Sequence, residues 1–89
     1  MSASIRTARD RGYVVIIMAN PRLAATAALD LKKGLANVDY ATVKCNEDSS
    51  WIFVEVDRAT LDALEPNARE TCWVALREKI GRLVETSPA

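Results

Sequence analysis

Residues 38–57 read VDYATVKCNEDSSWIFVEVD, and this stretch decides the fold. Apolar and polar residues alternate on both sides of the loop 47–50, which is typical of two half-buried strands joined in a hairpin. If the loop closes the pair Asn46–Trp51, every inward-facing residue meets another inward-facing residue. The inward pairs are then Cys45 with Ile52, Val43 with Val54, and Ala41 with Val56. A slip of one residue would break all of these pairs, so we predict strands over 38–46 and 51–57 in this register.

The opposite face of the same hairpin is unusually aromatic. The register places on it Tyr40, Thr42, Lys44, Trp51, Phe53 and Glu55. Three aromatic rings are more than a solvated sheet face needs. Either the N-terminal or the C-terminal segment covers them, or they form a contact surface, since Trp and Tyr are frequent anchors of protein interfaces.

Upstream of the hairpin, the apolar run from Tyr13 to Ala19 predicts a strand over 13–19 that is covered on both faces. Asn20 and Pro21 then predict the N-cap and first position of a helix over 21–35. The apolar stripe of this helix consists of Leu23, Ala24, Ala27, Ala28, Leu31 and Leu35. A parallel neighbour of the first strand would be reached by a crossover through this helix.

Downstream of the hairpin, Thr60 is the expected cap of a short turn that Pro66 and Asn67 end. Helical periodicity predicts a last helix from about Ala68 to Val84. Its buried stripe is expected to be Trp73, Leu76, Ile80 and Leu83. The fold class predicted from these elements is α+β: a small sheet of antiparallel or mixed strands, with a helix packed on one face and a C-terminal helical segment.

The chain is 89 residues long, which is the size of one domain. We predict a flexible N-terminal arm over 1–12, a single α+β domain over 13–86 and a frayed C-terminus over 87–89. The arm carries Arg6, Arg9 and Arg11 against the single carboxylate of Asp10. It is either a solvated tail or a segment that becomes ordered against a partner.

The composition excludes several function classes. Lys plus Arg equals Asp plus Glu at 12 each, so the chain lacks the basic excess of a protein that grips nucleic acid. Histidine, the commonest general base and metal ligand, is absent. Cys45 and Cys72 lack the number and spacing of a disulfide framework or a metal site, and we expect them to be reduced core thiols.

No apolar run is long enough to cross a membrane, and no signal peptide is recognisable, which favours the cytoplasm. The glycines form no phosphate-binding loop. We therefore expect no enzyme, no metal, no cofactor, no nucleic-acid partner and no membrane partner. The remaining class is a binding protein that acts on another molecule.

Three short motifs have counterparts in one family. They are Met18-Ala19-Asn20 between strand and helix, Thr60-Leu61 with Leu64 after the Trp51 strand, and Val74 with Leu76 before Gly81-Arg82-Leu83. In these motifs the chain resembles the small coupling (effector) proteins of bacterial multicomponent diiron monooxygenases, which include the regulatory proteins of methane, phenol and toluene monooxygenases. The link before the Trp51 strand is longer here than in that pattern. The resemblance also implies that part of 72–77 is extended, where periodicity predicts a helix.

This resemblance implies a non-catalytic regulator, monomeric when free, that binds the diiron hydroxylase and modulates oxygen and substrate access without holding a metal. Two alternatives stay open: a small dimeric ferredoxin-like regulatory or ligand-binding domain, and a phage or mobile-element inhibitor protein. The expected partner-binding residues are Arg6, Arg9, Arg11, Asn20, Tyr40, Trp51 and Phe53.

Overall fold

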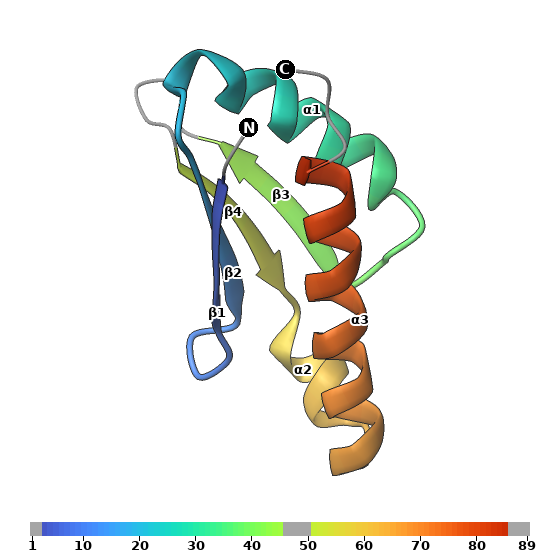
Figure 1. Cartoon of the computed structure of the whole chain (residues 1–89). Coiled ribbons are helices and arrows are strands. Elements are labelled where there is room, and N and C mark those ends of the chain that lie inside the picture. Colours follow the sequence, from blue (N-terminus) through green and yellow to red (C-terminus); the bar gives the residue numbers. More distant parts are fainter. Residues whose placement is uncertain (1–2, 46–50, 86–89) are drawn as a thin grey trace.

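The computed structural model describes residues 3–45 and 51–85, and in this part four strands form one antiparallel sheet in the order β1-β2-β4-β3 (Figure 1). The strands are β1 (Ala3–Ala8), β2 (Tyr13–Met18), β3 (Ala41–Cys45) and β4 (Trp51–Val56). The helices are the 3₁₀ turn η1 (Pro21–Leu23), α1 (Ala24–Gly34), α2 (Arg58–Asp62) and α3 (Pro66–Glu85). The predicted α+β class with a C-terminal helix is confirmed.

The register predicted for the β3–β4 hairpin is also confirmed. The observed Cα partners include Cys45 with Ile52, Val43 with Val54, and Ala41 with Val56. Ile52 and Val54 are fully buried, as expected for the inward face of a sheet that is covered on that side. The loop 46–50, and with it the closing pair Asn46–Trp51, lies outside the described residues.

The flexible arm expected over 1–12 is wrong, because residues 3–8 form the edge strand β1. It pairs with β2 along its whole length, from Ala3 opposite Met18 to Ala8 opposite Tyr13. The tight turn back to β2 is closed by the Gly12 amide, which donates to the Ala8 carbonyl at 2.9 Å. Gly12 has a φ of 76°, a conformation that residues with a Cβ rarely adopt. Pairing with β2 provides hydrogen-bond partners for the backbone groups of the polar segment 3–8. The composition of the segment does not reveal this pairing.

Strand β2 differs from the sequence prediction in its neighbours and in its covering. Both neighbours, β1 and β4, are antiparallel to it. The strand reached through α1 is β3, which runs parallel to β2 but is separated from it by β4. The order β2–α1–β3–β4–α3 is that of a ferredoxin-like βαββαβ unit without its last strand, and β1 supplies the fourth strand from the other end of the chain.

The helix after β2 begins as predicted. The Asn20 side chain accepts a hydrogen bond from the Arg22 amide at 3.0 Å, and Pro21 occupies the first turn. That turn is 3₁₀ before α1 continues as a regular helix. The expected stripe faces the core, where the alanines and leucines with at most 4% exposure are Ala24, Ala27, Ala28, Leu31 and Leu35.

Thr60 is not the cap of α2. The N-cap is Asp57, whose carboxylate accepts from the Ala59 amide at 3.1 Å and from the Thr60 hydroxyl at 3.0 Å. Pro66 starts α3 and does not end the preceding turn, in keeping with the preference of proline for the first helical turn. Residues 72–77 lie within α3 and are helical, as periodicity predicts and unlike the extended segment that the family resemblance implies.

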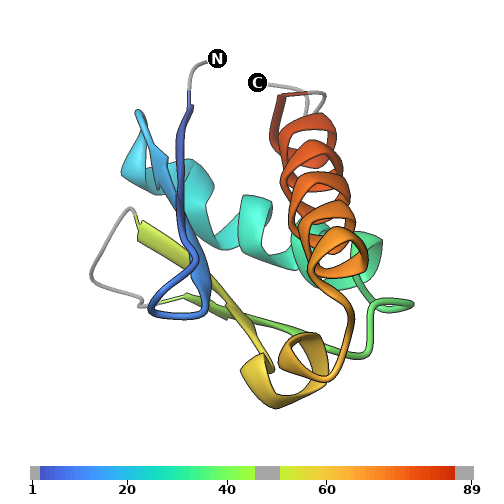
Figure 2. The ribbon, with the colours of Figure 1, turned by 90° about the horizontal axis from the view of Figure 1, so that it is seen from below.

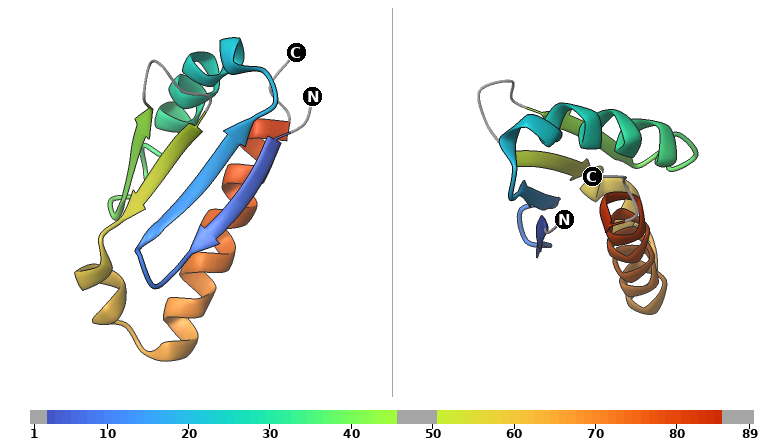
Figure 3. Two further views of the ribbon diagram at one scale, coloured as in Figure 1. Left: turned by 90° about the vertical axis from the view of Figure 1, so that its left-hand side faces the viewer. Right: turned by 45° about the horizontal axis from the view of Figure 1, so that its top comes forward.

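All the helices that contact the sheet lie on one side of it (Figure 2). Helix α1 packs against β3 and β4, helix α3 packs against β1, and the two helices contact each other. At this contact an added Cβ on Gly34 would lie 2.5 Å from a Leu83 methyl carbon, so a larger residue there would require the Leu83 side chain to move. Among the residues that the structure describes, the other face of the sheet carries no helix (Figure 3), which contradicts the expectation that strand 13–19 is covered on both faces.

Candidate binding surface

We define the outer face as the side of the sheet opposite the helices. The strand register assigns to it Ser4, Arg6, Ala8, Tyr13, Val15, Ile17, Thr42, Lys44, Trp51, Phe53 and Glu55. One row across the sheet consists of Arg6, Val15, Phe53 and Lys44, so that apolar side chains on the two central strands are flanked by a cation on each edge strand. This pattern of apolar centre and charged rim is that of a protein interface.

The centre of the outer face is an aromatic cluster. The Phe53 ring makes an edge-on contact with Tyr13 at a centroid distance of 5.7 Å and a tilted contact with Trp51 at 6.2 Å. Both distances lie in the range of favourable aromatic pairs. Trp51 is 44% exposed, whereas Val15, opposite Phe53 in the ladder, is only 8% exposed. The cluster therefore covers the middle of β2 and leaves part of the Trp51 side chain exposed.

The charges on the outer face are few. Lys44 on β3 and Glu55 on β4 form an ion pair at 2.9 Å, with both side chains at least half exposed. Such a pair contributes little to stability, about 0–1 kcal/mol. Over the described residues the face carries two cations, Arg6 and Lys44, and one carboxylate, Glu55.

Only part of the predicted contact set meets on this face. Trp51 and Phe53 lie at its centre, and Arg6 reaches its rim because residues 3–8 form β1. Arg9 and Arg11 lie at and beyond the end of β1, in the turn before β2, outside the outer face. Asn20 follows β2 and acts as the N-cap of η1.

Arg9 pairs with a carboxylate on α3, away from the outer face. Its guanidinium makes two hydrogen bonds to the Glu70 carboxylate on α3, one of them at 2.9 Å. The hydrogen bond from Arg9 holds the pKa of Glu70 below its usual value, and that bond likewise raises the pKa of Arg9. The pair ties the β1–β2 turn to the first part of α3.

Tyr40 is not on the outer face, which corrects the sequence prediction. Its side chain packs against the core next to Cys72 of α3. Burial raises the pKa of the Tyr40 phenol, and the neighbouring Cys72 thiol raises it further. The alternation of side chains holds only within a strand, and β3 begins at Ala41, so Tyr40 in the preceding turn points to the other side.

Tyr13 and Ile17 also belong to this surface, although neither was predicted from the sequence to do so. Both are half-buried on β2, and they join Trp51 and Phe53 because β2 and β4 are direct neighbours. The alternation of positions 13, 15 and 17 places these residues on one face of a strand. It does not show that they share this face with Trp51 and Phe53, because that depends on the pairing of β2 with β4. The strand order is a long-range property that the local pattern does not contain.

Across 3–45 and 51–85, no three His, Cys, Asp or Glu side chains gather closely enough to hold a metal ion. Cys45 and Cys72 are half-buried and pack against the core, as expected. No helix in this part of the chain is both long and apolar enough to span a bilayer.

Fold and surface together define a class: a small α+β domain with one covered and one open sheet face. No family model, no curated protein and no solved structure matches the chain.

Proposed function

We propose that this chain is a non-catalytic protein-binding module that contacts its partner through the outer face. The observation that carries the proposal is the aromatic cluster of Tyr13, Trp51 and Phe53 on a sheet face without helices. Aromatic side chains provide large contact areas at low cost in conformational entropy, and they dominate the binding energy of protein interfaces. The complete absence of histidine in the chain supports a role without catalysis of its own.

In its specific form, the proposal names the hydroxylase of a multicomponent diiron monooxygenase as the partner. This part rests on the sequence resemblance described above. The chain would be a cytoplasmic coupling protein, monomeric when free, that modulates oxygen and substrate access in the hydroxylase and holds no metal or cofactor. If so, genes for diiron hydroxylase subunits and for a flavin–iron–sulfur reductase lie beside the gene for this chain, and their absence there argues against this partner.

The binding test compares two substitutions at equally exposed apolar residues. Trp51 on the outer face and Val74 on α3 are both 44% exposed. We expect Trp51→Ala to weaken binding to the purified hydroxylase by about 2 kcal/mol or more, which is roughly thirtyfold in Kd, while Val74→Ala leaves it unchanged. Equal affinities of the Trp51→Ala variant and the wild-type chain would refute the outer face as the interface.

A dimeric ferredoxin-like regulatory domain is the second candidate, and the βαββα order of elements favours it. In that case the outer faces of two copies would bury Trp51 and Phe53 against each other. The excess cation on this face opposes self-association and favours a partner with an acidic rim. Sedimentation at micromolar concentration separates the candidates: a monomer supports the coupling protein, and a dimer that Trp51→Ala dissociates supports the regulatory domain.

A further inference from the structure

A hollow lies away from the outer face, where the β1–β2 turn, α2 and the start of α3 meet. It has a volume of about 360 Å³, at the lower end of the range typical of small-molecule sites. Its lining includes Arg9, Asp10, Arg58, Leu61, Arg69, Glu70 and Trp73. Leu61 and Trp73 are 2% and 5% exposed and form an apolar floor under a charged rim.

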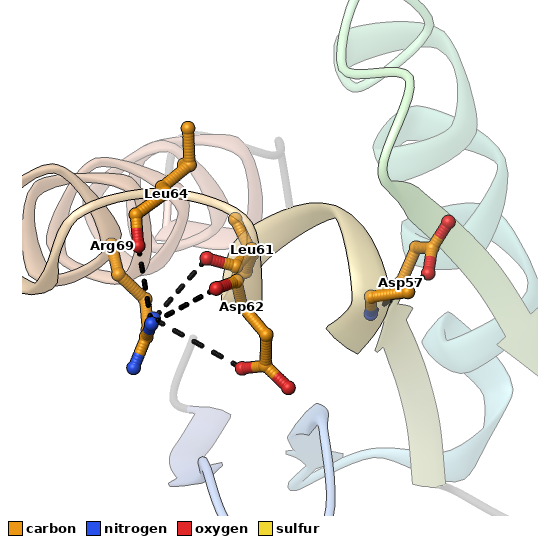
Figure 4. A network of polar contacts seen from close by, with 6 residues as sticks. Asp57, Leu61, Asp62, Leu64 and Arg69 are labelled. Atoms are coloured by element: carbon orange, nitrogen blue, oxygen red, sulfur yellow. Dashed lines mark hydrogen bonds and ion pairs between the residues drawn. The ribbon is translucent and has the colours of Figure 1, made fainter.

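Most charges on the rim already have partners. Arg9 binds Glu70, as described above. Arg69 donates to the carbonyl oxygens of Leu61, Asp62 and Leu64 at 3.1–3.2 Å and lies 4.0 Å from the Asp62 carboxylate (Figure 4). Arg69 therefore holds the end of α2 against α3 and fixes the shape of this wall.

Two charged side chains on the rim remain without a partner among the described residues: Arg58 of α2 and Asp10 of the β1–β2 turn. They have opposite signs and come from different elements. A ligand that satisfies both must carry an anionic and a cationic group.

The stem of Arg58 lies next to the backbone of Gly12. A Cβ added to Gly12 would lie 2.7 Å from both Cγ and Cδ of Arg58, so the arginine lies directly on the glycine backbone. The β1–β2 turn is itself bound to β4, because the Val56 amide donates a hydrogen bond to the Gly12 carbonyl at 2.8 Å. A guanidinium on an ordered stem loses less conformational entropy when it binds an anion.

We propose that this hollow binds a small zwitterion with an apolar body, such as a free α-amino acid with an aliphatic side chain. The Arg58 guanidinium donates to the ligand carboxylate, since its planar array of N–H groups matches a carboxylate in two parallel hydrogen bonds. The Asp10 carboxylate accepts from the ligand ammonium, and the aliphatic side chain lies on Leu61 and Trp73. This inference is independent of the proposed function, because none of these residues belongs to the outer face.

Three related probes test the proposal on the wild-type chain: L-leucine, N-acetyl-L-leucine, which lacks the cation, and L-leucinamide, which lacks the anion. Binding is followed by NMR through the amide signals of Arg58 and Leu61 and the indole signal of Trp73. We expect leucine to shift these signals, and each derivative to bind about tenfold or more weakly, because each loses one charge-assisted hydrogen-bonding group. If leucine leaves the signals unmoved, or if all three probes bind equally, the proposal is wrong.

Two variants then assign each charge. In Arg58→Gln, leucine and leucinamide should bind equally weakly, whereas in Asp10→Asn the same should hold for leucine and N-acetyl-leucine. Arg22→Gln on η1 is the control and should bind leucine like the wild-type chain. All three side chains are exposed, so the variants should keep the melting temperature of the wild-type chain. Unchanged discrimination between the probes in Arg58→Gln and Asp10→Asn would overturn the assignment.

Discussion

The two tryptophans should respond very differently to truncation. Trp73 is 5% exposed in the core between α3 and the sheet, whereas Trp51 is 44% exposed on the outer face. Truncating a buried aromatic residue to alanine removes its buried area and leaves a cavity, at a cost of about 3–5 kcal/mol. Truncating Trp51 removes roughly half as much buried area and leaves no enclosed void, so we expect a loss of about 1–2 kcal/mol.

The measurement is urea unfolding followed by far-UV circular dichroism, with the free energy of unfolding obtained by linear extrapolation. In a domain of this size, 1 kcal/mol corresponds to a shift of about 4–8 °C in Tm, so Trp73→Ala should lower Tm by roughly 12 °C or more. Trp73→Phe is the control, because it keeps a ring in the same cavity and should recover much of the loss. If Trp51→Ala destabilises the domain as much as Trp73→Ala, the outer face is part of the core and cannot serve as a freely accessible interface.

Three further predictions concern the sheet, its first turn and the ion pair on α3. Val54→Asp should abolish cooperative thermal unfolding, because Val54 is fully buried and the new carboxylate would have no partner there; a normal melting curve would contradict the β3–β4 register. Gly12→Ala should lower the free energy of unfolding by more than about 1–2 kcal/mol in urea titrations, since the φ of 76° is unfavourable for alanine and the added methyl group would press against Arg58; a neutral effect would mean that the turn relaxes freely. The pKa of the Glu70 carboxyl, measured by NMR, should be lower than usual in the wild-type chain and should rise to its usual value in Arg9→Gln. The ion pair then stabilises the fold at pH values above the ordinary glutamate pKa, and this stabilisation is lost as the pH falls. An unchanged Glu70 titration in the variant would exclude the pair in solution.

Local patterns in the sequence predicted the elements whose partners are close along the chain. The β3–β4 register follows from alternation around a short loop, and α1 follows from its cap at Asn20 and its apolar stripe. The strand β1 escaped prediction because its apolar content is low and its stability comes from pairing with β2. Thr60 is a good cap residue by type, but the N-cap is Asp57, which the sequence prediction assigned to the end of the strand 51–57.

The residues of the outer face divide in the same way, into those that a local pattern predicts and those that depend on the strand order. Trp51 and Phe53 were predicted to share a face because they lie two residues apart on one strand. Tyr13 and Arg6 join them through the pairing of β2 with β4 and of β1 with β2, contacts between distant parts of the chain. Tyr40 was placed wrongly because β3 begins at Ala41, whereas the predicted strand began at residue 38.

The position of β1 makes the fold suitable for circular permutation. The start of β1 and the last turn of α3 lie at the same end of the molecule, and β1 precedes the βαββα series in the chain (Figures 1 and 3). A short linker from the end of α3 to Ala3, with new ends opened in the turn 9–12, would convert the element order into βαββαβ without changing any strand neighbour. Circular permutation at exposed turns is commonly tolerated. Such a permutant would form β1 last during synthesis, so comparing the two chains would reveal whether the first hairpin guides assembly of the sheet or only completes its edge.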